Sequence, residues 1–437
     1  MIIQGKLRRT ARGARYTVLQ TLGRKFVHEL VGRIGVGRLE LVDHTGADQR
    51  RIVGGPGGPL VARLDVLDPR FYAAVVFGGR TGTAEAYIEG WWSSEDPAKV
   101  VELMTVNERA LRSMDGKLVK LLSPANRAAY WLRRNTKKGS RKNIAAHYDL
   151  SNDFFASFLD PSMTYSCGIF EREDSTLHEA QLEKIDRACR RLELSPGDRL
   201  LEIGTGWGSM AVHAASHYGC RVTTTTVSEA QHSYAAARIA EAGLSDRIEL
   251  LLTDYRDLEG KYDKLVSIEM IEAVGWKYFD TYFRKCSSLL EDDGRMLLQA
   301  IVIRDQDFHK AKKQQDFLKE YIFPGSCLAG VEAVATSVRR STDMRITHAE
   351  DIGPHYATTL RHWRENMWSN IDRIRAEGFN ERFIRLWEFY FCYCEGAFRA
   401  RSCGDVMFVL DKPGCRLAPC ATAVRGREDR AGEQVSR

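Results

Sequence analysis

The sequence predicts a doubly wound α/β fold, in which helices cover both faces of a mostly parallel sheet, preceded by a smaller α+β domain. Short apolar runs alternate with helical patterns after about residue 144. Within them, LLEIGTGWG at Leu200–Gly208 is typical of a buried strand that enters a glycine-rich turn. The chain of 437 residues, 44% hydrophobic and 28% charged, is long enough for two globular domains.

The smaller domain is predicted to span residues 1–125. Three segments in it have strand character and are separated by glycine-rich stretches, and these are Arg38–Asp43, Leu60–Val66 and Tyr72–Phe77. Helical patterning follows from Pro97 to Leu122, and the domain has no recognisable catalytic cluster. A basic linker at 126–143 leads to the catalytic domain at 144–411, and the polar residues 412–437 are expected to be a disordered tail.

The catalytic domain is expected to begin with a helix over Ser175–Leu194. Thr176 can cap that helix while Glu179 reaches back to the cap, which forms a capping box. The predicted strands are Arg199–Ile203, Arg221–Thr226, Ile248–Thr253, Lys264–Ile268, Arg295–Ile301, Asp343–Ala349 and Val406–Leu410. Helices fill the intervals between most of these strands, which favours parallel pairing.

The net charge of +6 is unevenly distributed. Residues 1–38 hold nine Lys or Arg and one acid, and Arg127–Lys142 holds seven bases and no acid. Such clusters fit an anionic surface, either a bilayer or a nucleic acid, or they are solvated helix faces. No apolar run approaches the length of a membrane span, and the basic start lacks the apolar region of a secretory signal. We therefore expect a cytoplasmic protein.

The ten cysteines have no repeated spacing, which suits a reducing compartment. Cys392 and Cys394 are separated by one residue, but no His or Cys follows them at zinc-finger spacing. We expect no metal site.

The glycine turn could hold a dinucleotide or another cofactor. In the dinucleotide fingerprint the third glycine follows the second by three residues, and an acid after the next strand binds the ribose. Here the glycines are Gly204, Gly206 and Gly208, and the next strand ends in VTTTTVS without an acid. Glu202, directly before the turn, fits instead a ligand that carries an amino group.

LEIGTGWG resembles the first motif of class I S-adenosylmethionine-dependent methyltransferases. The segments TDYRDL, YDKLVSIEM and LLEDDGRMLLQ follow in the order of that family. The resemblance implies a seven-stranded Rossmann-like sheet and S-adenosylmethionine as the methyl donor. The residues that it places around the donor are Tyr165 and Ser166 near the methionine part, Glu202, Gly204 and Gly206 at the turn, Thr226, Val227 and Gln231 near the ribose, and Tyr255 and Arg256 near the adenine.

Two further segments, AHYDLSNDFFASFLDPSMTYSCGIFE and SIEMIEAVG, resemble the cyclopropane fatty acid synthases. That resemblance runs from about Ile144 to Leu410, and the basic N-terminal domain resembles the extra domain of the branch that acts on phospholipids. It implies methyl transfer to the double bond of an unsaturated phospholipid acyl chain and closure of a cyclopropane ring. It also implies peripheral association with the inner membrane surface, no nucleic-acid partner and a possible homodimer.

The same resemblance implies that a bound bicarbonate ion removes the proton before the ring closes. Its ligands carry over to Cys167, Glu272, the backbone of Ile301, and Tyr356. The histidine expected two residues before Ile301 is Gln299, whose amide donates hydrogen bonds but carries no charge. A methyl or methylene branch is therefore the alternative product. Glu269 is an extra acid near the same edge, without an assigned role.

Other interpretations stay open from the sequence. Cys167 could be a nucleophile or a core cysteine, and Glu272 a solvated helix acid. The whole chain could be a lipid-binding or nucleic-acid-binding protein with an inactive methyltransferase domain. Seven aromatic residues on two C-terminal helical segments either line an acyl channel or pack in the core, and these are Trp363, Trp368, Trp387, Tyr390, Phe391, Tyr393 and Phe398.

Overall fold

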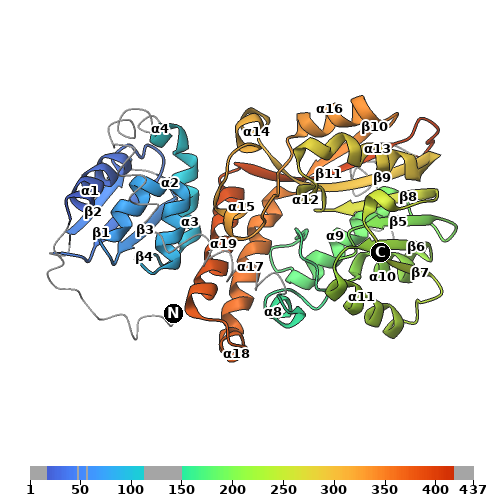
Figure 1. The fold of residues 1–437 in the computed structure, drawn as a ribbon, viewed down its shortest axis with the longest axis horizontal. Coiled ribbons are helices and arrows are strands. Elements are labelled where there is room, and N and C mark those ends of the chain that lie inside the picture. Colours follow the sequence, from blue (N-terminus) through green and yellow to red (C-terminus); the bar gives the residue numbers. More distant parts are fainter. Residues whose placement is uncertain (1–16, 47–48, 56–57, 113–149, 418–437) are drawn as a thin grey trace, which may run out of the picture. The chain divides into compact units, whose positions relative to one another are not determined.

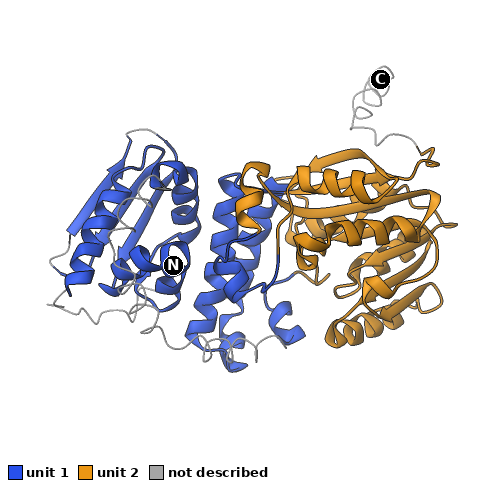
Figure 2. Cartoon of the chain, turned by 45° about the horizontal axis from the view of Figure 1, so that its top comes forward, with its two compact units in different colours: residues 1–159, 313–326, 353–404 blue, residues 160–312, 327–352, 405–437 orange. Residues whose placement is uncertain are grey.

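The computed structural model describes residues 17–46, 49–55, 58–112 and 150–417. The predicted linker at 126–143, the basic cluster Arg127–Lys142 and residues 418–437 of the predicted tail 412–437 lie outside the described residues. Residues 412–417 of that tail are described, and Lys412, which pairs with Asp343, and Cys415 are buried. The chain divides into two compact units (Figure 2). Unit 1 comprises residues 1–159, 313–326 and 353–404, and unit 2 comprises residues 160–312, 327–352 and 405–437.

The N-terminal part of unit 1 is a small sheet with helices, as predicted (Figure 1). Its strand order is β2-β1-β3-β4, and its strands are β1 (Arg38–Asp43), β2 (Gln49–Gly54), β3 (Val61–Val66) and β4 (Trp92–Ser93). Its helices are α1 (Val18–Val31), α2 (Arg70–Ile88), α3 (Pro97–Val106) and α4 (Glu108–Arg112). Two predicted strands are confirmed as β1 and β3, whereas β2 escaped prediction because its side chains are mostly exposed.

The predicted strand at Tyr72–Phe77 is wrong, because these residues belong to helix α2. A short apolar run has the same pattern in a buried strand and a buried helix, so periodicity could not separate them. Tyr72 is fully buried and its hydroxyl donates to Asp43 Oδ2 at 2.7 Å, which ties α2 to β1. The glycine-rich stretch that follows interrupts helix α2, because Gly79 has non-helical dihedral angles, φ 54° and ψ −133°.

The rest of unit 1 is helical. Its helices are α8 (Asn152–Ala156), α15 (Phe317–Tyr321), α17 (Gly353–Ser369), α18 (Ile371–Ala376) and α19 (Glu381–Arg399). Trp363, Trp387, Phe391 and Phe398 are buried, and ring pairs such as Phe158–Phe391 at 5.2 Å join α19 to the chain after α8. These aromatic residues therefore pack in the core of unit 1.

Unit 2 is built on a seven-stranded sheet of order β10-β11-β9-β8-β5-β6-β7 (Figure 1). The strands are β5 (Arg199–Ile203), β6 (Arg221–Thr226), β7 (Ile248–Leu252), β8 (Tyr262–Ile268), β9 (Leu290–Ile303), β10 (Arg345–Asp351) and β11 (Cys403–Asp411). All seven predicted strands are present. β5 pairs in parallel with β6 and β8, and β10 with β11 antiparallel.

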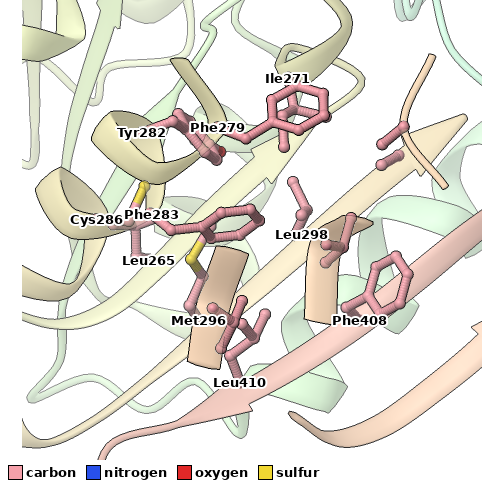
Figure 3. Close-up of a cluster of buried hydrophobic side chains, with 14 of the residues drawn as sticks. Leu265, Ile271, Phe279, Tyr282, Phe283, Cys286, Met296, Leu298, Phe408 and Leu410 are labelled. Atoms are coloured by element: carbon pink, nitrogen blue, oxygen red, sulfur yellow. The ribbon is translucent and has the colours of Figure 1, made fainter. Parts of the chain in front are cut away.

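Helices cover both faces of this sheet. Successive strand residues point to opposite faces, so neighbouring residues of one strand belong to different cores. Leu200 of β5 belongs to the core beneath α9 (Leu177–Leu192), α10 (Ser209–His213) and α11 (Glu229–Glu241). Its neighbour Leu201 belongs to the core with α13 (Phe279–Leu289) and α16 (Val331–Ser341). Figure 3 shows rings of α13 packed over Met296 and Leu298 of β9 and Leu410 of β11. The predicted doubly wound architecture is confirmed.

Short helices complete the described part of unit 2. They are α12 (Ile271–Val274), α14 (Asp305–Ala311), a π-helix at Ala214–Tyr218 and 3₁₀ turns at Tyr255–Asp257 and Trp276–Tyr278. The predicted capping box is confirmed at α9, where Glu179 N donates to Thr176 Oγ1 and Thr176 N to Glu179 Oε2. Within the described ranges, no helix combines the length and apolarity that a membrane crossing requires.

Candidate active site

The glycine turn lies at the carboxyl edge of the sheet, where ligands of open α/β sheets bind. Gly204 and Gly206 follow β5 with φ of 103° and 53°, in the range that favours glycine. A Cβ added to Gly206 would meet no atom within 4 Å, so the turn leaves open space for a ligand. At Gly204 an added Cβ would lie 3.4 Å from the side chain of Met270, which follows β8. The turn and the end of β8 therefore line the same place.

The residues expected around the ribose and adenine lie at the ends of the next two strands. Because β5, β6 and β7 are parallel, their carboxyl ends share one edge with the glycine turn. The Thr226 hydroxyl donates to Gln231 Oε1 at 2.9 Å, and the Val227 side chain is 74% exposed. Tyr255 packs edge-on against the buried Tyr282. Arg256 binds Asp254, and this ion pair is exposed.

Glu202 is buried beside the turn and accepts a hydrogen bond from the Thr224 hydroxyl at 2.6 Å. Burial raises its pKa to about 8, so this carboxyl is mostly protonated at neutral pH. A cationic amino group nearby would favour the ionised form. Glu202 therefore fits its predicted role, which is to bind a ligand that carries an amino group.

Ser166 is held by two buried polar side chains of α9. Lys184 Nζ donates to Ser166 Oγ at 2.7 Å, and Gln181 Nε2 donates to the Ser166 carbonyl at 2.7 Å. Burial lowers the pKa of Lys184, and the charge of Glu269 is the largest influence that opposes this shift. Sequence reasoning missed both α9 residues. Their signal was present, since both fall on the apolar stripe of the helix with Leu177, Ala188 and Leu192.

A buried hydrogen-bond network connects Glu269 with Gln299 of β9, with Asp405 of β11 and with the backbone of Cys167, next to Ser166. Gln299 Nε2 donates to Glu269 Oε1 at 2.9 Å and to Asp405 Oδ2 at 2.8 Å. The backbone N–H of Cys167 also donates to Glu269 Oε1, at 2.8 Å. Gln299 and Asp405 are fully buried, and burial followed by the charge of Glu269 raises the pKa of Asp405 well above its usual range. Asp405 is a site residue that the sequence did not suggest.

Cys167 contributes its backbone to this network. Its buried thiol donates to the carbonyl oxygens of Gly168 and Ile352, at 3.3 and 3.7 Å. Full burial and contacts to two backbone carbonyls are typical of a core cysteine, which disfavours the nucleophile interpretation.

Glu272 lies three residues after Glu269, in the first turn of α12. It is 9% exposed, and its Oε1 accepts a hydrogen bond from Ile301 N at 2.6 Å. Burial, and next the charge of Glu269, raise its pKa to about 8. The interpretation as a solvated helix acid is therefore excluded.

Unit 2 thus holds every predicted site residue except Tyr356. Tyr356 lies on α17 of unit 1, where it is 5% exposed and its ring stacks on Phe398 with centroids 4.4 Å apart. Among the side chains that the structure describes, no group of three or more His, Cys, Asp or Glu could hold a metal ion.

Comparison with known proteins matches residues 135–407 to the family model described as mycolic acid cyclopropane synthetase. The chain is 38% identical over 331 residues to the tuberculostearic acid methyltransferase UfaA1 of Mycobacterium tuberculosis, covering 74% of this chain and 76% of that one. It is 35% identical over 347 residues to the cyclopropane-fatty-acyl-phospholipid synthase of Escherichia coli, covering 79% and 86%.

Among solved structures, the mycolic acid cyclopropane synthase CmaA1 complexed with SAH and CTAB superposes with a TM-score of 0.57 at 33% identity. The match covers 62% of this chain and 98% of that one. A coclaurine N-methyltransferase bound to SAH gives the same TM-score at 20% identity, which supports the fold alone. The open glycine turn fits the cofactor of such enzymes.

Proposed function

The chain belongs to the mycolic acid cyclopropane synthetase family, and from this premise we propose that it converts unsaturated phospholipid acyl chains into cyclopropane acyl chains. The family and fold make it an S-adenosylmethionine-dependent methyltransferase that modifies lipids. The phospholipid substrate, the cyclopropane product and the docking of the enzyme on a membrane surface are the proposal.

S-adenosylmethionine supplies an electrophilic methyl group, and the residues at the ends of β5, β6 and β7 would hold it. An alkene is a weak nucleophile, so the chain has to align the acyl double bond closely with that methyl group. Methylation leaves a carbocation, which water would trap, so the site has to exclude water. A base must then take a proton from the transferred methyl group, and the released electron pair closes the ring.

The buried network around Gln299 is the observation that carries this proposal. It includes two carboxyl groups, Glu269 and Asp405, in a mostly water-excluded site, and the side chain of Met270, next to Glu269, would lie 3.4 Å from a Cβ added at Gly204. A protected acceptor for a proton is what a carbocation reaction needs. The resemblance implies bicarbonate as that acceptor.

A methyl or methylene branch is the second candidate product. Gln299 favours it, because an uncharged amide stands where the resemblance implies a histidine and so changes the environment of the acceptor. The name of UfaA1 describes it as a tuberculostearic acid methyltransferase, and this relative matches 74% of the chain. In this alternative, the proton leaves a chain carbon or the methyl group, and its electron pair forms a double bond.

Mass spectrometry of total fatty acids from cells rich in monounsaturated phospholipid tests both candidates. Cells expressing the protein should contain a species heavier by one CH₂, absent with the control Gly206→Val, whose side chain fills the turn. Resistance of the new species to mild hydrogenation identifies the cyclopropane, and uptake of hydrogen identifies the methylene branch. No heavier species with the intact protein would contradict the proposed function.

A further inference from the structure

We infer that Glu269 is the proton acceptor of this enzyme, a carboxylate built into the chain that occupies the place expected for bicarbonate. The inference rests on the proposed function, because it names the residue that completes that reaction.

The hydrogen-bond donors expected for bicarbonate in unit 2 are already engaged by carboxyl groups of the chain. Gln299 Nε2 and the backbone N–H of Cys167 both donate to Glu269 Oε1, at 2.9 and 2.8 Å. Ile301 N donates to Glu272 Oε1 at 2.6 Å. A bicarbonate ion would have to displace these carboxyl groups to reach the same donors.

The surrounding charge also disfavours a bound anion. Glu269 and Glu272 face the network from the segment after β8 and Asp405 from β11, whereas Lys184 is the buried base near Glu269 and Asp405 among the residues that the structure describes. Burial, and next the charge of Glu269, raises the pKa of both Asp405 and Glu272, which favours the neutral form of these two groups. The residues present therefore fit one ionised carboxylate, and they do not fit a bicarbonate ion in addition.

Glu269 differs from its neighbours in two ways that suit a base. Its backbone has φ of 48°, a left-handed conformation that is unusual for a residue with a side chain. Strain of this kind persists where the surrounding structure holds it, and it is common at active sites. Its side chain is also partly exposed, whereas Gln299 and Asp405 are fully buried. Glu269 is thus the member of the network that a substrate can reach, and Gln299 is a positioning residue.

The step balances without another reactant. The C–H bond of the transferred methyl group breaks, and its proton passes to the Glu269 carboxylate. The electron pair of that bond forms the third carbon–carbon bond of the ring and neutralises the cation. Glu269, now a neutral acid, returns the proton to solvent before the next turnover.

Glu269→Gln tests the inference, because the amide keeps the size of the side chain but cannot take up the proton. The purified protein is assayed on monounsaturated phospholipid vesicles in buffer freed of carbon dioxide, with and without added bicarbonate. The intact protein should turn over equally in both. Glu269→Gln should lose about 100-fold or more in rate, and the matched control Glu241→Gln, an exposed acid on α11, should lose nothing. Calorimetric binding of S-adenosylhomocysteine should be kept by all three.

Glu269→Gly provides the converse test. Glycine adopts φ of 48° without strain, and its lack of a side chain frees the donors on Cys167 and Gln299. This variant should be inactive without bicarbonate and regain activity when bicarbonate or formate is added.

Calorimetry with bicarbonate alone decides the inference independently of turnover. Heat of binding is expected for Glu269→Gly and none for the intact protein. Bicarbonate binding by the intact protein, a rate that needs bicarbonate, or a fully active Glu269→Gln would overturn the assignment of Glu269. If the intact protein methylates no unsaturated lipid in any buffer, the proposed function fails, and the bicarbonate titration still tests whether the anion site is occupied by Glu269.

Discussion

Glu202 and Glu272, two buried acids of the candidate site, show how burial changes the charge of a carboxyl group. Glu202 and Glu272 are both at most 9% exposed, and burial raises the pKa of each to about 8. A carboxyl that is neutral in the folded protein does not repel a carboxyl beside it. Burial of Glu272 therefore lowers the charge repulsion between Glu272 and Glu269, three residues away.

Glu272 makes stability depend on pH in a predictable direction. Its pKa is about 8 in the folded protein against an ordinary 4.5, so the folded state binds the proton more tightly. The free energy of unfolding should fall as pH rises between these values and stay low above them. Glu272→Gln cannot titrate, so its stability relative to the intact protein should rise over that window, by on the order of a few kcal/mol.

Urea unfolding at pH values below, within and above the window measures this difference. The control Glu241→Gln should track the intact protein at each pH. A constant difference between Glu272→Gln and the intact protein would contradict a neutral Glu272 in the fold.

At the scale of elements, helix α9 both packs on the sheet and holds Ser166 in place. One face of the helix packs on β5 through Leu192 and its apolar neighbours, and the same face carries Gln181 and Lys184 to Ser166. The helix therefore fixes the loop that is expected to contact the methionine part of the methyl donor.

Lys184→Met should weaken S-adenosylhomocysteine binding by about tenfold, the effect of one lost hydrogen bond to a charged donor. The change removes the bond to Ser166 Oγ but keeps a side chain of similar length. Isothermal titration calorimetry measures the affinity, and Lys310→Met on exposed α14 is the matched control. Unchanged affinity in Lys184→Met would show that Ser166 needs no support from α9.

A single glycine sets the approach of α19 to α3 in unit 1. A Cβ at Gly396 would lie 2.6 Å from the Ala98 carbonyl oxygen and 2.8 Å from Glu102 N, both on α3. Gly396→Ala should therefore push the helices apart and lower the free energy of unfolding by about 1–3 kcal/mol. Thermal denaturation measures the loss. Gly35→Ala, where an added Cβ meets no atom within 4 Å, should cost much less.

Helices and strands could be predicted where a short stretch of sequence contains the whole pattern that determines them. The strands of unit 2 follow one another as apolar runs between turn and helix signals, and β5 and β6 begin and end where predicted. Tyr72–Phe77 failed because a run of six apolar residues suits either state. Asp405 could not be found, since its partner Gln299 is 106 positions away and only the sheet brings them together. Lys184, by contrast, was visible as a charge on an apolar stripe.

At the scale of the whole molecule, the excess positive charge is the feature that points to a membrane surface. Within the described residues of the N-terminal cluster, Arg24 is bound to Asp43 at 2.9 Å, whereas Lys25 is exposed on α1. The cluster therefore includes bases with a structural role and bases that can face lipid headgroups.

Binding to vesicles that contain anionic phospholipid should weaken as salt is added, because each base near the surface contributes about 1 kcal/mol that salt screens. Lys25→Glu should lower the affinity at low salt. Arg221→Glu changes the net charge equally, at the exposed start of β6, and should leave the affinity near that of the intact protein. Vesicle cosedimentation over a salt series measures the affinity of each variant. An affinity that does not change with salt concentration would contradict electrostatic docking.

The position of β11 has a consequence for the order in which the protein can mature on the ribosome. β11 follows β9 and β10 in the chain but lies between them in the sheet, so β10 cannot join the other strands until β11 has been made. β11 also delivers Asp405, the partner of Gln299. A nascent chain that already has the glycine turn, Glu269 and Gln299 therefore still lacks its complete proton-accepting site. Catalytic competence should therefore appear only after β11 has been made and has paired in the sheet.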